Sequence, residues 1–137
     1  MSTGSPEATE AAAERLAVHL RRGDLLLLHG EMGAGKTTFV RGLARGVGAP
    51  DDVMSPTFQL VRVYRGRLQL AHVDLYRLGD VAELTDLGLD DLLDEGAAVV
   101  EWGDRMADPS AAVVVIDVLG RNRRRLRIER GPASWSW

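Results

Sequence analysis

The sequence has 137 residues, of which 45% are hydrophobic and 27% are charged, a composition typical of one soluble domain rather than two. It contains no cysteine, which excludes disulfide bonds and thiolate metal sites. The net charge of -3 is too small to indicate a nucleic-acid-binding protein, although residues 121–130 carry six arginines and residues 80–95 carry seven acids and no base. No apolar run approaches the ~20 residues of a membrane span, and the start lacks the features of a signal peptide, so we expect a cytoplasmic protein outside the membrane.

The N-terminal part of the chain predicts a helix, a buried strand, a loop and a second helix. Ser5 is a suitable N-cap for a helix with an apolar stripe, and this helix is expected to end near Gly23. Residues 24–29 contain four consecutive leucines bounded by turn residues, which is typical of a short strand covered on both faces. After the glycine-rich residues 30–35, apolar residues recur at helical spacing until the stop signals at residues 48–50.

The remaining chain predicts mainly strands. Residues 58–64 and 68–74 flank a short Arg-Gly-Arg turn and predict a hairpin. The acidic segment 80–95 predicts one or two short helices. Three further β-rich segments are expected to form strands, at residues 97–101, 113–119 and 123–130. We find no internal repeat and expect a single domain over residues 1–137, with a flexible tail at residues 131–137 in which Trp135 and Trp137 have no assigned role.

Residues 30–37 match the pattern G-x-x-x-x-G-K-[ST] of a phosphate-binding loop. Chance is a poor explanation, because a chain of this composition is expected to contain roughly 0.001 such matches. Glycines let backbone amides surround phosphate oxygens, and the following helix adds the partial positive charge of its N-terminus. Lys36 would reach the β and γ phosphates, and the Thr37 hydroxyl would bind Mg²⁺. The loop residues that we expect to bind the nucleotide are Glu31, Met32, Gly33, Ala34, Gly35, Lys36, Thr37 and Thr38.

A phosphate-binding loop also needs an acid near the magnesium ion, usually at the end of an apolar strand. Asp74 and Glu101 each end such a strand, and spacing alone does not rank them. Together they would hold the metal and orient an attacking water. His72 lies two residues before Asp74 and therefore on the same side of the strand, where a packed or solvated histidine is the more common role.

The composition also narrows the choice of nucleotide. Conventional GTPases read guanine with an N-K-x-D loop, but the only lysine of this chain is Lys36, in the phosphate-binding loop. ATP is therefore the favoured nucleotide.

Four separated strings resemble one known family. GEMGAGKTTFVRGLARGVG, SPTFQLVRVY, HVDLYRL and VVEW occur in the order found in TsaE, the bacterial ATPase family of tRNA threonylcarbamoyladenosine synthesis. The resemblance implies an α/β fold of the P-loop NTPase type with three layers, in which a central, mostly parallel sheet has antiparallel strand additions. It also implies hydrolysis of ATP with Mg²⁺, in support of the TsaD and TsaB proteins that place the threonylcarbamoyl group on an adenosine beside the tRNA anticodon.

The same resemblance implies roles for individual residues. In the family, the loop threonine and the glutamate of the EW pair are linked to Mg²⁺, which points to Thr37 and Glu101. The aspartate of HxDxYRL is linked to hydrolysis, which points to Asp74, and we expect Lys36, Asp74 and Glu101 to carry the catalysis.

Two further family positions lie beside the nucleotide. The threonine of the N-terminal helix corresponds to Thr9. The arginine near the last strands corresponds to Arg121, although Arg123 and Arg124 compete for that place in the alignment.

Two other functions stay open at this level. A P-loop kinase for small molecules would use the same loop, but the chain lacks an obvious acceptor-binding or arginine-rich lid segment after it. A nucleotide-gated binding module would bind ATP with negligible catalysis. An indirect or weak contact with tRNA also stays open.

Overall fold

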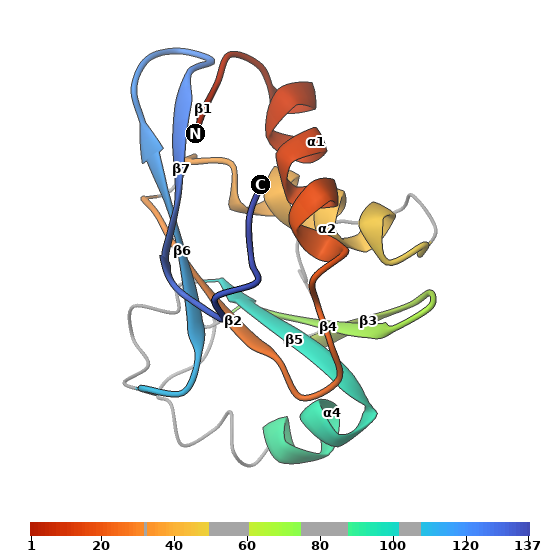
Figure 1. Ribbon diagram of the computed structural model, residues 1–137. Coiled ribbons are helices and arrows are strands. Elements are labelled where there is room, and N and C mark those ends of the chain that lie inside the picture. The colour runs from red at the N-terminus through yellow and green to blue at the C-terminus, as the bar shows by residue number, and fades with distance from the viewer. Residues whose placement is uncertain (32, 50–60, 75–87, 102–107) are drawn as a thin grey trace.

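The computed structural model describes residues 1–31, 33–49, 61–74, 88–101 and 108–137. Within these ranges one sheet has the strand order β1-β7-β6-β2-β5-β4-β3, and helices lie against it (Figure 1). The strands are β1 Ser2–Thr3, β2 Leu25–His29, β3 Val61–Arg65, β4 Gln69–Asp74, β5 Gly96–Glu101, β6 Ala112–Val118 and β7 Arg124–Arg130. The helices are α1 Pro6–Ala17, α2 Lys36–Gly46 and α4 Leu89–Glu95.

The centre of the sheet is parallel and its margins are antiparallel. Strand β2 pairs in parallel with β5 and β6, and β4 pairs in parallel with β5. Strand β3 is antiparallel to β4, and β7 is antiparallel to β6. The predicted parallel sheet with antiparallel additions is therefore confirmed, as is the predicted hairpin, although its expected residues 58–60 lie outside the described ranges. The two-residue strand β1, antiparallel to β7, was not predicted, because it is too short to show a periodic pattern.

The consecutive leucines of β2 are buried on both faces of the sheet, as predicted. Leu26 and Leu28 belong to the core that faces α1 and α2. Leu25 and Leu27 belong to a second core, against which the leucines of α4 pack. Because side chains alternate along a strand, four leucines in a row serve both cores and give a three-layer arrangement.

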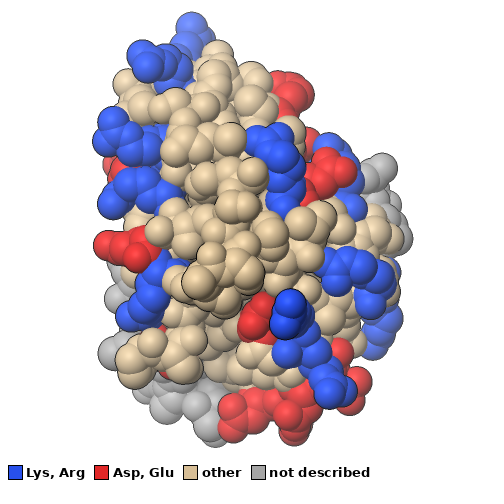
Figure 2. All heavy atoms as spheres, in the orientation of Figure 1, with Lys and Arg blue, Asp and Glu red and all other residues tan. Residues whose placement is uncertain are grey.

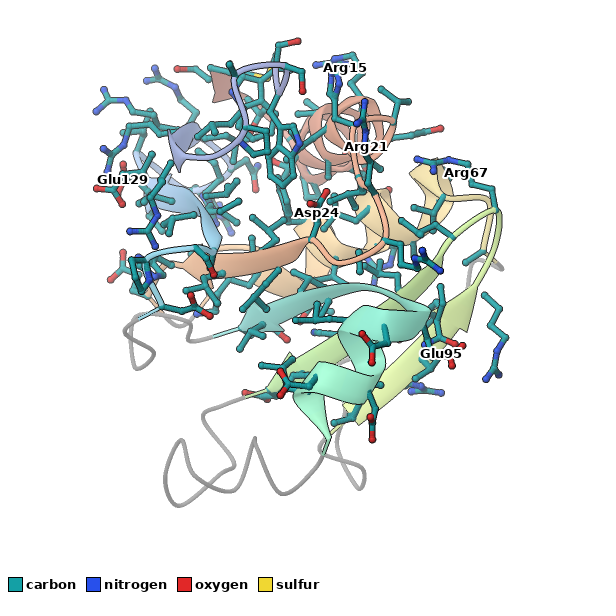
Figure 3. The ribbon with its side chains drawn as sticks, turned by 60° about the horizontal axis from the view of Figure 1, so that its bottom comes forward. Arg15, Arg21, Asp24, Arg67, Glu95 and Glu129 are labelled. Carbon is teal, nitrogen blue, oxygen red and sulfur yellow. The ribbon has the colours of Figure 1, made fainter. Side chains whose placement is uncertain are left out.

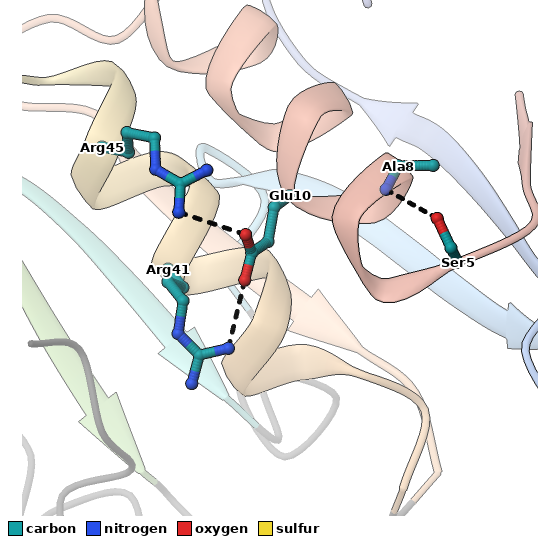
Figure 4. A network of polar contacts seen from close by, with 5 residues as sticks. All are labelled: Ser5, Ala8, Glu10, Arg41 and Arg45. Carbon is teal, nitrogen blue, oxygen red and sulfur yellow. Dashed lines mark hydrogen bonds and ion pairs between the residues drawn. The ribbon is translucent and has the colours of Figure 1, made fainter. Parts of the chain in front are cut away.

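Both ends of α1 are capped by polar groups. The Ser5 hydroxyl accepts a hydrogen bond from the Ala8 amide at 3.1 Å, which confirms the predicted N-cap (Figure 4). The helix ends at Ala17 rather than near Gly23. Arg67, at the tip of the β3–β4 hairpin (Figure 3), donates to the Ala17 carbonyl at 2.7 Å, so a distant side chain satisfies a terminal carbonyl that a longer helix would have used.

The C-terminal segment is packed, so the prediction of a flexible tail over residues 131–137 is wrong for its tryptophans. Trp135 is 8% exposed and belongs to the core beneath α1 and α2. The Trp137 ring stands edge-on to Phe39 of α2, with centroids 6.0 Å apart. Figure 1 shows this segment returning from β7 toward the two helices. A periodic pattern could not predict this packing, because only Trp135 and Trp137 of the segment pack against the core.

The arginine-rich and acid-rich segments of the sequence lie at different places on the surface (Figure 2). Figure 2 shows basic side chains along the margin where β6 and β7 lie, and acidic side chains at the end that contains α4. Of the acidic segment, residues 88–95 are described and include α4, which confirms one of the one or two short helices expected there. In the described ranges, no helix combines the length and apolar character needed to cross a membrane.

Candidate nucleotide-binding site

The glycine-rich loop connects the end of β2 to the start of α2, as the sequence predicts. Gly33 and Gly35 have φ angles of 80° and 101°, a left-handed conformation that residues with a side chain rarely adopt. Gly35 is the N-cap of α2 and offers no side chain to its first amides. These amides are therefore suited to bind an anion from outside the chain. Met32, which we expected in the same loop, lies outside the described residues.

Lys36 is folded back over this loop. Its side chain is buried, with the residue 6% exposed. The Nζ atom donates to the carbonyl oxygens of Gly30 at 2.6 Å and Glu31 at 3.3 Å. The structure thus holds the ammonium group inside the loop, where phosphate oxygens could exchange with these carbonyl acceptors.

A cavity of about 140 Å³ lies beside the loop. It brings together the start of α1, the loop, the first turns of α2 and the β6–β7 turn, and it is lined by Pro6, Thr9, Gly33, Ala34, Gly35, Thr38, Asn122 and Arg124. Thr9 is 2% exposed, and its hydroxyl is 2.7 Å from that of Thr3 in β1. The sequence-predicted residues Thr9 and Thr38 therefore meet the loop, whereas Asn122 was not foreseen.

The arginine that contacts the loop is Arg124. Its Nε donates to the Ala34 carbonyl at 2.9 Å, and its Nη2 donates to the Gly33 carbonyl at 3.2 Å. Arg121 is exposed on the β6–β7 turn and does not line the cavity. A signal was present in the sequence, because Arg124 lies two residues before the buried Leu126 and so on the inward face of β7.

Two carboxylates lie at the carboxyl ends of adjacent parallel strands. Asp74 of β4 and Glu101 of β5 are direct partners in the strand register, and Glu101 is also the partner of Leu28, two residues before the loop begins. Asp74 is 7% exposed and Glu101 is 4% exposed. The register therefore brings together the two acids that the sequence could not rank.

This pair of acids fits a divalent cation. Two neighbouring buried carboxylates repel each other and lose hydration, and a cation compensates both costs. Among the described residues, no group of three His, Cys, Asp or Glu side chains is placed to hold a metal by itself. Mg²⁺ is usually bound by one or two carboxylates together with phosphate oxygens, a donor set that Asp74 and Glu101 could supply in part. Thr37 lies in the first turn of α2, directly after the loop, and its side chain carries a hydroxyl group.

His72, two residues before Asp74 on β4, is fully buried. Its Nε2 is 2.6 Å from Oε2 of Glu101. Of the two common roles considered from the sequence, the packed histidine is the one observed, and its partner is a residue of the candidate site.

A parallel sheet with a phosphate-binding loop between β2 and α2, and acids at neighbouring strand ends, defines a P-loop nucleotide-binding protein. The family model described as "Threonylcarbamoyl adenosine biosynthesis protein TsaE" matches residues 3–128. The chain belongs to the TsaE family, and the resemblance noted in the sequence is thereby confirmed.

Curated relatives and a solved structure agree with this assignment. A protein of Treponema pallidum is 40% identical over 80% of this chain and 84% of its own length. A protein of Streptomyces coelicolor is 46% identical over 85% of this chain and 75% of its own length. A protein of Aquifex aeolicus is 39% identical over 92% of this chain and 92% of its own length. All three are named tRNA threonylcarbamoyladenosine biosynthesis protein TsaE. The crystal structure of YdiB from Bacillus subtilis superposes with a TM-score of 0.76 at 34% identity, covering 92% of this chain and 80% of YdiB.

Proposed function

We propose that this protein is a Mg²⁺-dependent ATPase of tRNA threonylcarbamoyladenosine synthesis, acting in the cytoplasm in support of TsaD and TsaB. Membership of the TsaE family and the names of the relatives support the pathway. The observation that carries the chemistry is the register of Asp74 with Glu101, on strands adjacent to the one that leads into the phosphate-binding loop.

The nucleotide would be held by the loop and by the residues around the cavity. The Lys36 ammonium group would exchange the carbonyls of Gly30 and Glu31 for oxygens of the β and γ phosphates. The amides at the start of α2 would complete the phosphate site. In the proposal, the residues around the nucleotide are Thr9, Glu31, Met32, Gly33, Ala34, Gly35, Lys36, Thr37 and Thr38, with Arg124 in the place first expected for Arg121.

The metal would be held by Thr37, Glu101 and Asp74, directly or through water. When bound, Mg²⁺ supplies positive charge that neutralises the phosphate oxygens. Asp74 would accept a hydrogen bond from the attacking water and orient it toward the γ phosphorus. A bond would then form from the water oxygen to Pγ while the Pγ–O bond to ADP breaks, so that ATP and water give ADP, inorganic phosphate and a proton released to solvent.

Two substitutions separate binding from hydrolysis. Lys36→Ala removes a charge-assisted phosphate contact and should weaken ATP binding by about 1.5 to 3 kcal/mol, measured by calorimetry. Asp74→Asn keeps the size of the side chain and should lower ATP turnover by about 100-fold or more while ATP still binds. Asp91→Asn, an exposed carboxylate of α4, is the matched control and should change neither quantity.

The pathway is tested with the partner proteins. Turnover by the isolated protein should be weak and should rise when TsaD and TsaB are added. Unchanged turnover and unchanged tRNA modification after their addition would refute the proposal. Transfer of the γ phosphate to a nucleoside or metabolite would instead identify a kinase. Full cellular function of the Asp74→Asn variant would identify a nucleotide-gated binding module.

A further inference from the structure

One of the two candidate metal ligands takes part in a buried hydrogen bond that the proposed reaction does not explain. His72 of β4 and Glu101 of β5 join through Nε2 and Oε2 at 2.6 Å. Their side chains are 0% and 6% exposed. His72 is the register partner of Val99, two residues before Glu101, so the bond runs diagonally between adjacent strands on one face of the sheet.

We infer that His72 is a positioning residue that fixes the carboxylate of Glu101 for metal binding. The inference rests on the proposed function, because it assigns Glu101 to the metal. A glutamate side chain has three rotatable bonds, and a bond to one carboxylate oxygen fixes the plane of the group and so the direction of the other oxygen. An ionised carboxylate can only accept, so the bond to ionised Glu101 is the one in which Nε2 of His72 donates.

The second nitrogen of His72 argues against a role in packing alone. Among the described residues, Nδ1 of His72 is buried and has no hydrogen-bond partner. Such a buried, unsatisfied nitrogen is unfavourable, and an apolar side chain at this place on the sheet would avoid the cost. The hydrogen bond from Nε2 to Glu101 is the favourable contact that offsets the cost of burying Nδ1. Groups that hold a metal ligand from behind in this way commonly change metal affinity 10- to 100-fold when they are removed.

The test compares variants that keep or remove the donor. The Nε2 amide of His72→Gln reaches the same position as the imidazole Nε2, whereas His72→Leu fills space without a donor. The probe is Mn²⁺ titrated into full-length protein saturated with ADP, followed by electron paramagnetic resonance. We expect His72→Leu to weaken Mn²⁺ binding about 10- to 100-fold and His72→Gln to restore it to within about threefold of wild type. The affinity of both variants for ADP without metal should stay within about twofold of wild type. This control measurement shows that each variant is folded.

A double substitution shows whether the effect acts through Glu101. In a Glu101→Gln background, His72→Leu should cause no further loss of Mn²⁺ affinity, because the group that it positions is already gone. Additive losses would overturn the inference, as would a His72→Leu variant with wild-type metal affinity or a His72→Gln variant as weak as His72→Leu. If His72→Leu does not fold, His72→Asn replaces it, since its shorter amide does not reach Glu101.

The two proposals fail in different ways. If Glu101→Gln binds Mn²⁺ as tightly as wild type, the assignment of Glu101 to the metal is wrong, and the role of His72 is lost with it. If Glu101→Gln weakens Mn²⁺ binding and His72→Leu does not, only the positioning role is wrong.

Discussion

Helices α1 and α2 approach each other closely at Gly42, which makes this position a sharp test of the packing. A Cβ atom at Gly42 would lie 2.2 Å from the Glu10 carbonyl oxygen and 2.7 Å from the Ala13 Cβ. Contacts between carbon and oxygen are normally about 3.3 Å or longer. Since the obstacle is the backbone of α1 and not a flexible side chain, Gly42→Ala requires the helices to separate by about 1 Å.

The expected cost follows from two opposing terms. Overpacking of a tight contact costs about 1 to 3 kcal/mol, and replacing a helical glycine by alanine returns up to about 1 kcal/mol. The clash with backbone puts the first term at its upper end, so we expect a net loss of about 2 to 3 kcal/mol and a melting temperature lower by about 6 to 15 °C. Separation would also disturb the bridge from Glu10 to Arg41 and Arg45, at 3.1 and 3.2 Å (Figure 4).

The same separation would move Thr9 of α1 away from Thr38 of α2, which line one cavity. Nucleotide affinity should therefore fall together with stability. Urea and thermal unfolding measure the first effect, and calorimetry with ADP measures the second. Gly4→Ala is the control, because a Cβ there meets no atom within 4 Å. A Gly42→Ala variant as stable as wild type would show that helix propensity outweighs the clash, which would refute this reasoning.

Three further predictions concern the loop, the tail and pH. Arg124→Ala should lower the free energy of unfolding by about 1 to 3 kcal/mol and weaken ADP binding, because it removes two hydrogen bonds to the loop. Arg121→Ala should change neither quantity. If the two variants have equal effects in unfolding and calorimetry, the contact of Arg124 with the loop is contradicted. Trp135→Ala should cost about 2 to 4 kcal/mol in urea unfolding, and an unchanged midpoint would mean that the tail does not pack. The hydroxyl and amide of Ser110 hold the pKa of Asp108 below its usual value. Asp108 therefore stabilises the fold at pH values above the ordinary carboxyl pKa, and this contribution is lost as the pH falls through the lowered pKa of Asp108 in the folded protein. In an NMR titration, Ser110→Ala should raise the pKa of Asp108. An unchanged pKa would argue against the hydrogen bond from Ser110.

Local features of the chain determined much of this protein in advance. The match to G-x-x-x-x-G-K-[ST], the Ser5 cap and the leucines of β2 each depend on neighbouring residues only, because backbone conformation and side-chain alternation are local properties. For that reason the loop, its strand and its helix could be predicted, and so could the two acids at strand ends. Residue types alone also favoured ATP, through the single lysine.

Tertiary structure decided which of these groups meet. The register that pairs Asp74 with Glu101, the bond from His72, the choice of Arg124 over Arg121 and the burial of Trp135 all join residues far apart in the chain. Such contacts depend on strand order and on the packing of helices across the sheet, neither of which leaves a periodic trace in the sequence. The sequence by itself therefore predicted which residues carry the chemistry of the site. Only the folded sheet decided which of these residues are in contact, because a contact depends on distance in space and not on spacing along the chain.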